Sequence, residues 1–186
     1  MIGYAFCGSY CTWSASLLAL RRLIELGEDI QPIFSEHACT TDTRFFTAAD
    51  FVREVESVCG RRAIRSIVEA EPLGPKIPLD CLIIAPCTGN TLAKISHGIT
   101  DTTVTMAAKA HLRQDRPLLI SLATNDAMSQ NLSNIASLLT RKSLYFVPML
   151  QDDPKGKPYS LVADMSLIPD ALAAMRENRQ LRPLFL

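Results

Sequence analysis

Four short segments rich in small, hydroxyl and amide side chains are the part of this sequence best suited to chemistry. They are Gly8-Ser9-Tyr10-Cys11, Ser35-Glu36-His37, Pro86-Cys87-Thr88-Gly89-Asn90-Thr91 and Ala123-Thr124-Asn125-Asp126. The first, third and fourth lead into segments with helical periodicity. Free N–H groups at a helix N-terminus favour an anion such as phosphate, and Ser and Thr hydroxyls add donors. Together the segments predict a site for a phosphate-bearing ligand, although each one alone would also serve as an ordinary helix cap or turn.

The sequence contains no standard phosphate or metal fingerprint. Gly8 stands alone after the first apolar run, without the further glycines or the lysine of the dinucleotide-binding and P-loop motifs. The six cysteines are scattered, with no CxxC pair and no histidine cluster, so we expect no metal site. Cys11 and Cys87 fall in two of the turns, where each is either a redox-active thiol or a small turn residue.

Short apolar runs alternate with segments of helical periodicity along the whole chain. Strands are expected at residues 2–7, 30–35, 80–85, 117–123 and 144–148. Helices are expected at residues 12–27, 47–60, 92–99, 104–114, 128–139 and 165–175. Residues 36–46 and 151–158 are expected to be loops, and residues 61–70 to form either a helix or an extra strand.

This alternation predicts an α/β fold with a single domain over residues 1–186. The expected architecture is a doubly wound parallel sheet, in a Rossmann-like or flavodoxin-like three-layer sandwich. Ligands of such sheets bind beyond the carboxyl ends of the strands, which is where the four turns fall. We therefore expect Ser9, Thr88 and Asn125 to surround a common hollow.

The composition excludes several classes of protein. Lys and Arg number 19, as do Asp and Glu, so the zero net charge gives no overall attraction to nucleic acid or to an anionic membrane. At 48% hydrophobic residues the chain is neither disordered nor collagen-like. No apolar run approaches the roughly 18 residues of a membrane span, and no signal peptide is recognisable. We expect a cytoplasmic protein.

Residues 85–101 carry a resemblance to a known family. The run Ala85-Pro86-Cys87-Thr88-Gly89-Asn90-Thr91-Leu92-Ala93-Lys94, continuing to Gly98-Ile99-Thr100-Asp101, is similar to the APxxANTxAKxxxGIxD signature of the FMN-binding cysteine-decarboxylase flavoproteins. The segment Ala123-Thr124-Asn125-Asp126-Ala127-Met128 resembles their second signature, AMNxxM. Gly8-Ser9 fits their first phosphate-side loop.

Segments outside the flavin motif narrow the resemblance to the family of dipicolinate synthase B subunits. They lie at residues 70–76, 78–81, 106–110, 121–127 and 151–158, so the resemblance covers nearly the whole chain. It implies a flavoprotein subunit that oxidises a dihydrodipicolinate to dipicolinate (pyridine-2,6-dicarboxylate) in the mother cell of a sporulating bacterium. The implied partner is an A subunit that binds the nicotinamide cofactor NADP. The resemblance also implies a homotrimer or a multiple of one.

The resemblance implies FMN as the cofactor, or a phosphate site left where FMN has been lost. The residues expected to bind it are Gly8, Ser9, Ser35, Ala85, Pro86, Thr88, Asn90, Thr91, Ser121, Asn125 and Met128. Met128 also falls on the apolar stripe of an expected helix, where a core position is favoured.

Aromatisation of a dihydropyridine removes a hydride and a proton, and a flavin ring can accept the hydride. Asn125 is the expected contact at the ring or substrate edge, and His37 is either a proton carrier or an ordinary turn histidine. Arg44, Lys155 and Lys157 are expected to hold the two substrate carboxylates, unless they are solvated surface charges.

Two alternative functions remain, an FMN-dependent decarboxylase and a non-catalytic scaffold that activates the A subunit. The decarboxylases use a His just before the third strand's apolar run and a late Cys. Here residues 74–80 contain no His and no Cys follows Cys87, which disfavours that alternative. Gly89 stands where the family signature has Ala, a change that would reshape the flavin contact.

Overall fold

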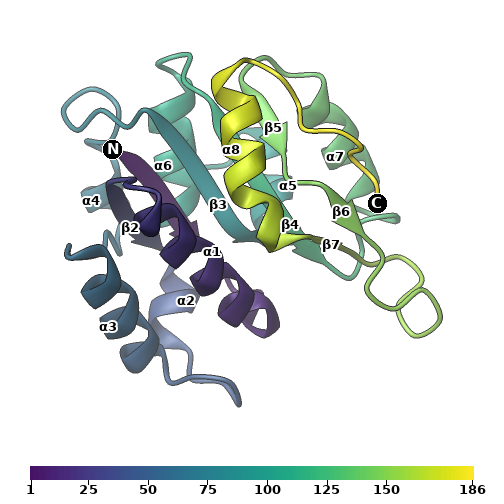
Figure 1. The fold of residues 1–186 in the computed structure, drawn as a ribbon, viewed down its shortest axis with the longest axis horizontal. Coiled ribbons are helices and arrows are strands. Elements are labelled where there is room, and N and C mark those ends of the chain that lie inside the picture. Colours follow the sequence, from purple (N-terminus) through teal and green to yellow (C-terminus); the bar gives the residue numbers. More distant parts are fainter.

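A seven-stranded sheet forms the centre of the molecule, in a computed structural model that describes all of residues 1–186 (Figure 1). Its five parallel strands are β1 (Ile2–Phe6), β2 (Ile30–Phe34), β3 (Cys81–Cys87), β4 (Leu118–Thr124) and β5 (Leu144–Phe146). They lie in the order β2-β1-β3-β4-β5, with Ile2 opposite both Ile30 and Cys81. Every residue of β1, β2 and β3 is buried, as expected of strands covered on both faces. The predicted α/β three-layer fold is confirmed.

The sheet is not purely parallel, which the sequence did not predict. Two short strands, β6 (Met149–Leu150) and β7 (Leu161–Ala163), add an antiparallel extension in which Ala123 of β4 pairs with Val162. Strand β5 pairs only with residues 118–120 of β4, so the last residues of β4 would otherwise present an open edge. Strand β7 covers that edge, a common device against edge-to-edge association.

Three helices cover one face of the sheet, namely α1 (Trp13–Glu25), α3 (Ala48–Cys59) and α8 (Ile168–Arg176) (Figure 1). Their apolar faces bury an aromatic cluster on β1 and β2. The Trp13 and Phe51 rings stack with centroids 4.1 Å apart, and Phe6 lies 5.0 Å from Phe34. Aromatic burial of this kind supplies both apolar area and a preferred ring geometry.

The other face is covered by α4 (Ile67–Ala70), α5 (Gly89–His97), α6 (Thr103–Leu112) and α7 (Leu132–Leu139). Leu92, Val104 and Leu138 of these helices pack on Ile120 and Phe146 of the sheet. Two short 3-10 helices complete the fold, η1 (Tyr10–Thr12) and η2 (Met165–Leu167). No helix in the structure combines the length and apolar character needed to cross a membrane.

Several element boundaries differ from the sequence predictions for local reasons. The expected loop at 36–46 contains α2 (Glu36–Thr40), because Ser35 caps it by accepting a hydrogen bond from the Ala38 N–H. In the ambiguous stretch 61–70, Ile64 bridges to Ile33 and a turn of helix follows. The helix expected from residue 128 begins only at Leu132, because residues 125–131 form consecutive turns.

Candidate functional site

The loops that follow β1, β3 and β4 enclose a hollow of about 650 Å³ at the carboxyl edge of the sheet, called here the main hollow. Ser9, Thr88 and Asn125 all line it, so the structure brings together the three residues expected to share a hollow. Its other polar linings are Cys11, Thr12, Asn90, Thr124, Asp126, Asp152 and Lys157. Consecutive loops meet here because parallel strands end at the same edge.

A smaller hollow of about 260 Å³, the side hollow, opens where β2 ends. Ser35, Glu36 and His37 line it, together with Cys7, Tyr10, Thr91 and Thr102. The two hollows share Gly8, Thr88 and Asn90 as lining residues, and we call them together the cleft. Asn125 and His37 line different hollows, so these two catalytic candidates lie toward opposite ends of the cleft.

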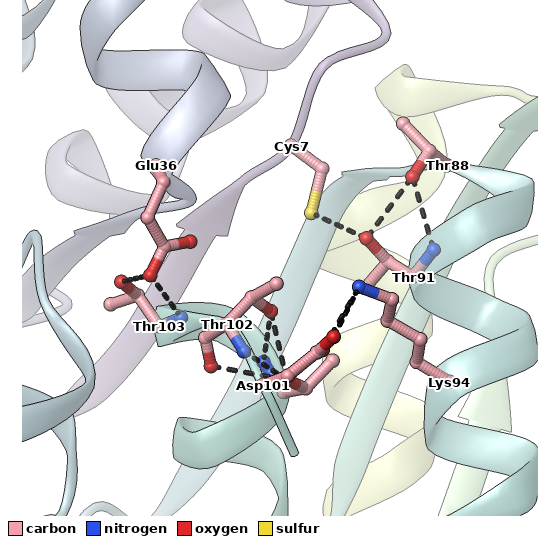
Figure 2. Close-up of polar contacts among 9 residues, drawn as sticks. Cys7, Glu36, Thr88, Thr91, Lys94, Asp101, Thr102 and Thr103 are labelled. Carbon is pink, nitrogen blue, oxygen red and sulfur yellow. Dashed lines mark hydrogen bonds and ion pairs between the residues drawn. The ribbon is translucent and has the colours of Figure 1, made fainter. Parts of the chain in front are cut away.

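Thr88 is held at the junction of the two hollows by the start of α5 (Figure 2). Its Oγ1 accepts the Thr91 N–H at 3.2 Å, which caps the helix, and donates to Thr91 Oγ1 at 3.0 Å. Thr91 Oγ1 then donates to Cys7 Sγ at 3.4 Å. Burial raises the pKa of the Cys7 thiol to about 11, so this acceptor is neutral at physiological pH.

A polar network lies behind Gly89 at the wall of the main hollow. The Asp126 carboxylate accepts hydrogen bonds from Thr124 Oγ1 and, at 3.0 Å, from Asn131 Nδ2. A Cβ added to Gly89 would lie only 2.6 Å from both Thr124 Oγ1 and Asn131 Nδ2. A side chain at position 89, where the family signature has Ala, would therefore have to displace part of this network.

Lys157 is the single Lys or Arg that lines the cleft, and it is already paired. Its Nζ lies 2.8 Å from an Asp152 carboxylate oxygen. The hydrogen bond raises the pKa of Lys157 and lowers that of Asp152. Arg44 and Lys155 line neither hollow, and both are exposed. The Arg44 guanidinium lies 4.8 Å from the centroid of the Phe45 ring, so the structure does not bring either side chain to a ligand in the cleft.

Four residues predicted to bind the cofactor line neither hollow. Ser121 is fully buried, and its hydroxyl donates to Met165 Sδ at 3.1 Å. Ala85 and Pro86 are buried in β3, where their carbonyls accept from Ser16 Oγ and the Cys7 N–H. Met128 borders a separate apolar hollow with Leu161. None of the four lines the main hollow or the side hollow, so a role for them in cofactor binding stays a prediction.

The two cysteines singled out in the sequence have different environments. Cys11 is exposed and lines the main hollow. Cys87 is fully buried among apolar side chains, and burial raises its pKa well above the usual value. A buried neutral thiol is a core residue rather than a nucleophile, so only Cys11 is placed to contact a ligand. The structure contains no group of three or more His, Cys, Asp or Glu side chains able to hold a metal ion.

Sequence reasoning missed the most unusual group in the cleft, Glu36. Its Oε1 accepts hydrogen bonds from the Thr103 N–H at 2.9 Å and the Thr103 Oγ1 at 2.7 Å (Figure 2). Its Oε2 is buried and has no hydrogen-bond partner. Glu36 belongs to the segment Ser35-Glu36-His37 that the sequence singled out, but no pattern in the sequence indicates its contact with Thr103, which lies 67 positions away.

Comparison with known proteins places this architecture among flavoproteins. A family model described as Flavoprotein matches residues 1–181. The B subunit of dipicolinate synthase from Bacillus subtilis (strain 168) is 42% identical over 183 residues, covering 98% of this chain and 92% of the relative. The crystal structure of the dipicolinate synthase B subunit from Bacillus halodurans C superposes with a TM-score of 0.91 at 39% identity, covering 100% of this chain and 95% of that one. The FMN-dependent cysteine decarboxylase SpaF shares the fold, with a TM-score of 0.66 at 21% identity over 95% of each chain.

Proposed function

The chain belongs to the flavoprotein family and, within it, to the family of dipicolinate synthase B subunits, and from that premise we propose that it is the flavin-binding subunit of a dipicolinate synthase. With an A subunit that carries NADP, it would oxidise a dihydrodipicolinate to dipicolinate. The cellular setting we propose is the mother-cell cytoplasm of a sporulating bacterium. The single observation that carries the proposal is the convergence of Ser9, Thr88 and Asn125 on one hollow at the carboxyl edge of the sheet.

The cleft fits FMN in size and in most of its chemistry. The main hollow alone is within the range of about 300–1,000 Å³ typical of small-molecule sites. The hydroxyls of Ser9, Ser35 and Thr88 line it and the side hollow, and the exposed amides of Asn90 and Asn125 supply donors and acceptors. One group runs against the fit, because the unpartnered Glu36 oxygen lies in the side hollow where an anion would be expected.

Hydroxyl and backbone groups at the side hollow would hold the phosphate. Ser35 and Thr88 are already held in place as helix caps, so their side chains would lose little conformational entropy when the phosphate binds. Gly8 leaves the backbone of the first loop open to close approach, since only the Tyr10 ring lies near the place of a Cβ. Thr91 accepts a hydrogen bond from Thr88 and so helps to orient the Thr88 hydroxyl. Because Thr91 also lines the side hollow, it would contribute to phosphate binding both directly and through Thr88.

The main hollow would receive the flavin ring and the substrate. When bound, a flavin supplies a hydride acceptor. Asn125 would orient the ring or the substrate edge, and Lys157 would attract one substrate carboxylate while sharing its charge with Asp152. His37 is the other catalytic candidate, and would move a proton at the side hollow.

The cleft contains more carboxylates than cations, so a negatively charged substrate would need positive charge from another chain. Glu36, Asp126 and Asp152 line it against the single cation Lys157. A dicarboxylate substrate needs further positive charge, which we propose comes from another chain, either the A subunit or a neighbouring copy in a homotrimer or a multiple of one. The single chain has a mass of 20.5 kDa, so sedimentation should report a multiple of three times that value.

Reconstitution tests the proposed function directly. We expect the purified chain to bind FMN with a flavin absorption spectrum, and dipicolinate to form at a rate well above that of the A subunit alone once this chain is added. Asn125→Asp should lower that rate at least tenfold, whereas Gln130→Glu, an exposed neighbour outside the cleft, should leave it unchanged.

Three results would count against the proposal. Turnover by the A subunit alone as fast as by the mixture would make this chain a scaffold at most. Loss of carbon dioxide from a peptide cysteine would instead favour the decarboxylase alternative. Unchanged turnover in Asn125→Asp would remove that residue from the chemistry.

A further inference from the structure

Glu36 projects from α2 toward the first residue of α6 and ends in the side hollow (Figure 2). Thr103 satisfies one carboxylate oxygen with two hydrogen bonds, at 2.9 and 2.7 Å. Figure 2 shows the other oxygen turned away from Thr103, and this oxygen is buried with no donor within reach. An unpaired buried carboxylate oxygen is costly, so this atom calls for a partner that the chain itself does not provide.

No cation of the chain neutralises this carboxylate. The titratable groups beside it are the thiols of Cys7 and Cys39, the phenol of Tyr10 and the imidazole of His37. The charges of Arg65 and Glu69 also act on Cys39, but Arg65 is paired with Glu56 at 3.6 Å. Burial, with a smaller contribution from the Glu36 charge, raises the pKa of both thiols, so they remain neutral. The other elements around the side hollow contribute the uncharged side chains of Ser35, Thr88, Asn90, Thr91 and Thr102.

Lys94, which Figure 2 draws in the same region, is engaged elsewhere. Lys94 of α5 lies 2.9 Å from Asp101, within the loop between α5 and α6 (Figure 2). A phosphate that enters the side hollow therefore meets hydroxyl donors and one carboxylate with no intervening cation. Two like charges in one partly buried site cannot both stay ionised without a large penalty, and the usual outcome is that one of them takes up a proton.

We propose that Glu36 makes phosphate binding in the side hollow proton-coupled, so that a phosphate monoester is bound together with one proton that is taken from solvent and held between the carboxylate and the phosphate. A proton between Oε2 and a phosphate oxygen forms a hydrogen bond between the two groups, which removes their like-charge repulsion and gives Oε2 the partner that it lacks. Glu36 is thus a specificity residue that weakens binding of a phosphate dianion as the pH rises. This inference rests on the proposed binding of a flavin phosphate in the cleft.

The test compares FMN with riboflavin, which lacks the phosphate, between pH 5.5 and 8. Dissociation constants come from flavin fluorescence for the wild-type chain, for Glu36→Gln, and for Glu71→Gln, an exposed glutamate outside the cleft, as matched control. Glutamine keeps an oxygen for Thr103 and presents an uncharged donor at the other position. The phosphate's own ionisation near pH 6 lies inside this pH range, and Glu36→Gln shows the pH dependence that it causes when no carboxylate is present, so the difference between the two profiles reports the Glu36–phosphate pair.

At pH 8 we expect Glu36→Gln to bind FMN at least about tenfold more tightly than the wild type, while at pH 5.5 the two agree within about threefold. Riboflavin affinity should be the same in all three proteins at every pH. Calorimetry of the wild type in two buffers of different ionisation enthalpy should show uptake of about one proton per FMN at pH 7.5, and this measurement needs no variant. The proton uptake should be absent with riboflavin.

Parallel pH profiles for FMN in the wild type and Glu36→Gln would overturn the inference while leaving flavin binding intact. Wild-type binding of FMN without proton uptake would do the same. Failure of all three proteins to bind either flavin at any pH would overturn the inference and the proposed flavin site together.

Discussion

Of the six cysteines, one has an exposed side chain and five are buried or partly buried. Cys11 is exposed, whereas Cys7, Cys81 and Cys87 are buried and Cys39 and Cys59 partly so. Burial raises the pKa of Cys7 to about 11 and that of Cys81 to about 12, so the reactive thiolate is scarce at both sites. At pH 8 we expect iodoacetamide to label Cys11 first, by at least about tenfold in rate, as read by mass spectrometry of the digested protein.

Two comparisons make the labelling experiment specific. All six thiols should label at similar rates in denaturant, and Cys11→Ser should remove the fast phase. Saturating FMN should slow labelling of Cys11, since that residue lines the main hollow. Rapid modification of Cys87 in the native protein would contradict the burial described above.

The sequence could identify some residues of the cleft and not others for a physical reason. Ser9, Thr88 and Asn125 each follow an apolar strand, and the ends of parallel strands must meet, so their proximity is predictable from local patterns. The unpaired state of the Glu36 Oε2 depends instead on Thr103, which binds the other oxygen, and on the lack of any ion pair to this carboxylate. Ser121 lines neither hollow, because its buried hydroxyl donates to Met165, a contact that no local pattern in the sequence indicates.

Gly89, the first residue of α5, shows how contacts between elements override a local preference. Alanine favours helices over glycine, yet a Cβ here would lie 2.6 Å from Thr124 Oγ1 and Asn131 Nδ2. We expect Gly89→Ala to destabilise the fold by about 1–3 kcal/mol through overpacking. Urea denaturation followed by circular dichroism measures this directly.

Asn131→Ala provides the control for that experiment, because it removes one of the three atoms that would lie within 3.0 Å of the added Cβ. The cost of Gly89→Ala should be smaller in the Asn131→Ala background than in the wild type, a non-additivity typical of touching residues. A Gly89→Ala protein as stable as the wild type would instead mean that helix propensity dominates at this position.

His111 of α6 makes the stability of that helix sensitive to acid. The residue is fully buried, with Nε2 2.8 Å from the Pro117 carbonyl oxygen and Nδ1 unpaired. Burial lowers the pKa of His111, because desolvation disfavours the imidazolium. In the unfolded chain His111 takes up a proton near pH 6.5, whereas in the folded chain burial disfavours that proton. The free energy of unfolding therefore keeps its full value above that pH and decreases as the pH falls below it.

The expected result is a lower urea midpoint at pH 5.0 than at pH 7.5 in the wild type, and a smaller drop in His111→Gln. Glutamine retains an N–H donor but does not titrate. His97→Gln, at an exposed position on α5, should behave as the wild type. An equal drop in all three proteins would assign the acid sensitivity to other groups.

At the scale of the whole molecule, the sequence predicted the parallel sheet and its helical layers but not strands β6 and β7. The parallel strands fall in continuous apolar runs of the sequence, even β5, whose three residues lie in the longer run 144–148, and β1 is buried along all five of its residues. Strands β6 and β7 have only two and three residues and flank the polar loop at 151–158, so no separate apolar run of strand length marks them in the sequence. They exist because the end of β4 needs a partner beyond the reach of β5, which is a property of the assembled sheet.

A ligand held by loops from four separate strands should stabilise the entire fold, because the site exists only when the sheet is assembled. If FMN binds the cleft, a concentration of 100 times its dissociation constant adds about 2.7 kcal/mol to the free energy of unfolding. For a domain of this size each kcal/mol raises Tm by about 2–4 °C, so the expected rise is about 5–10 °C by differential scanning fluorimetry.

Thr88→Ala and Thr47→Ala form a matched pair, since both remove a helix cap worth about 1 kcal/mol but only Thr88 lines the cleft. Both variants should melt slightly below the wild type, and only Thr88→Ala should lose most of the FMN-dependent rise. An equal rise in the two variants would show that FMN binds elsewhere, or without the help of Thr88.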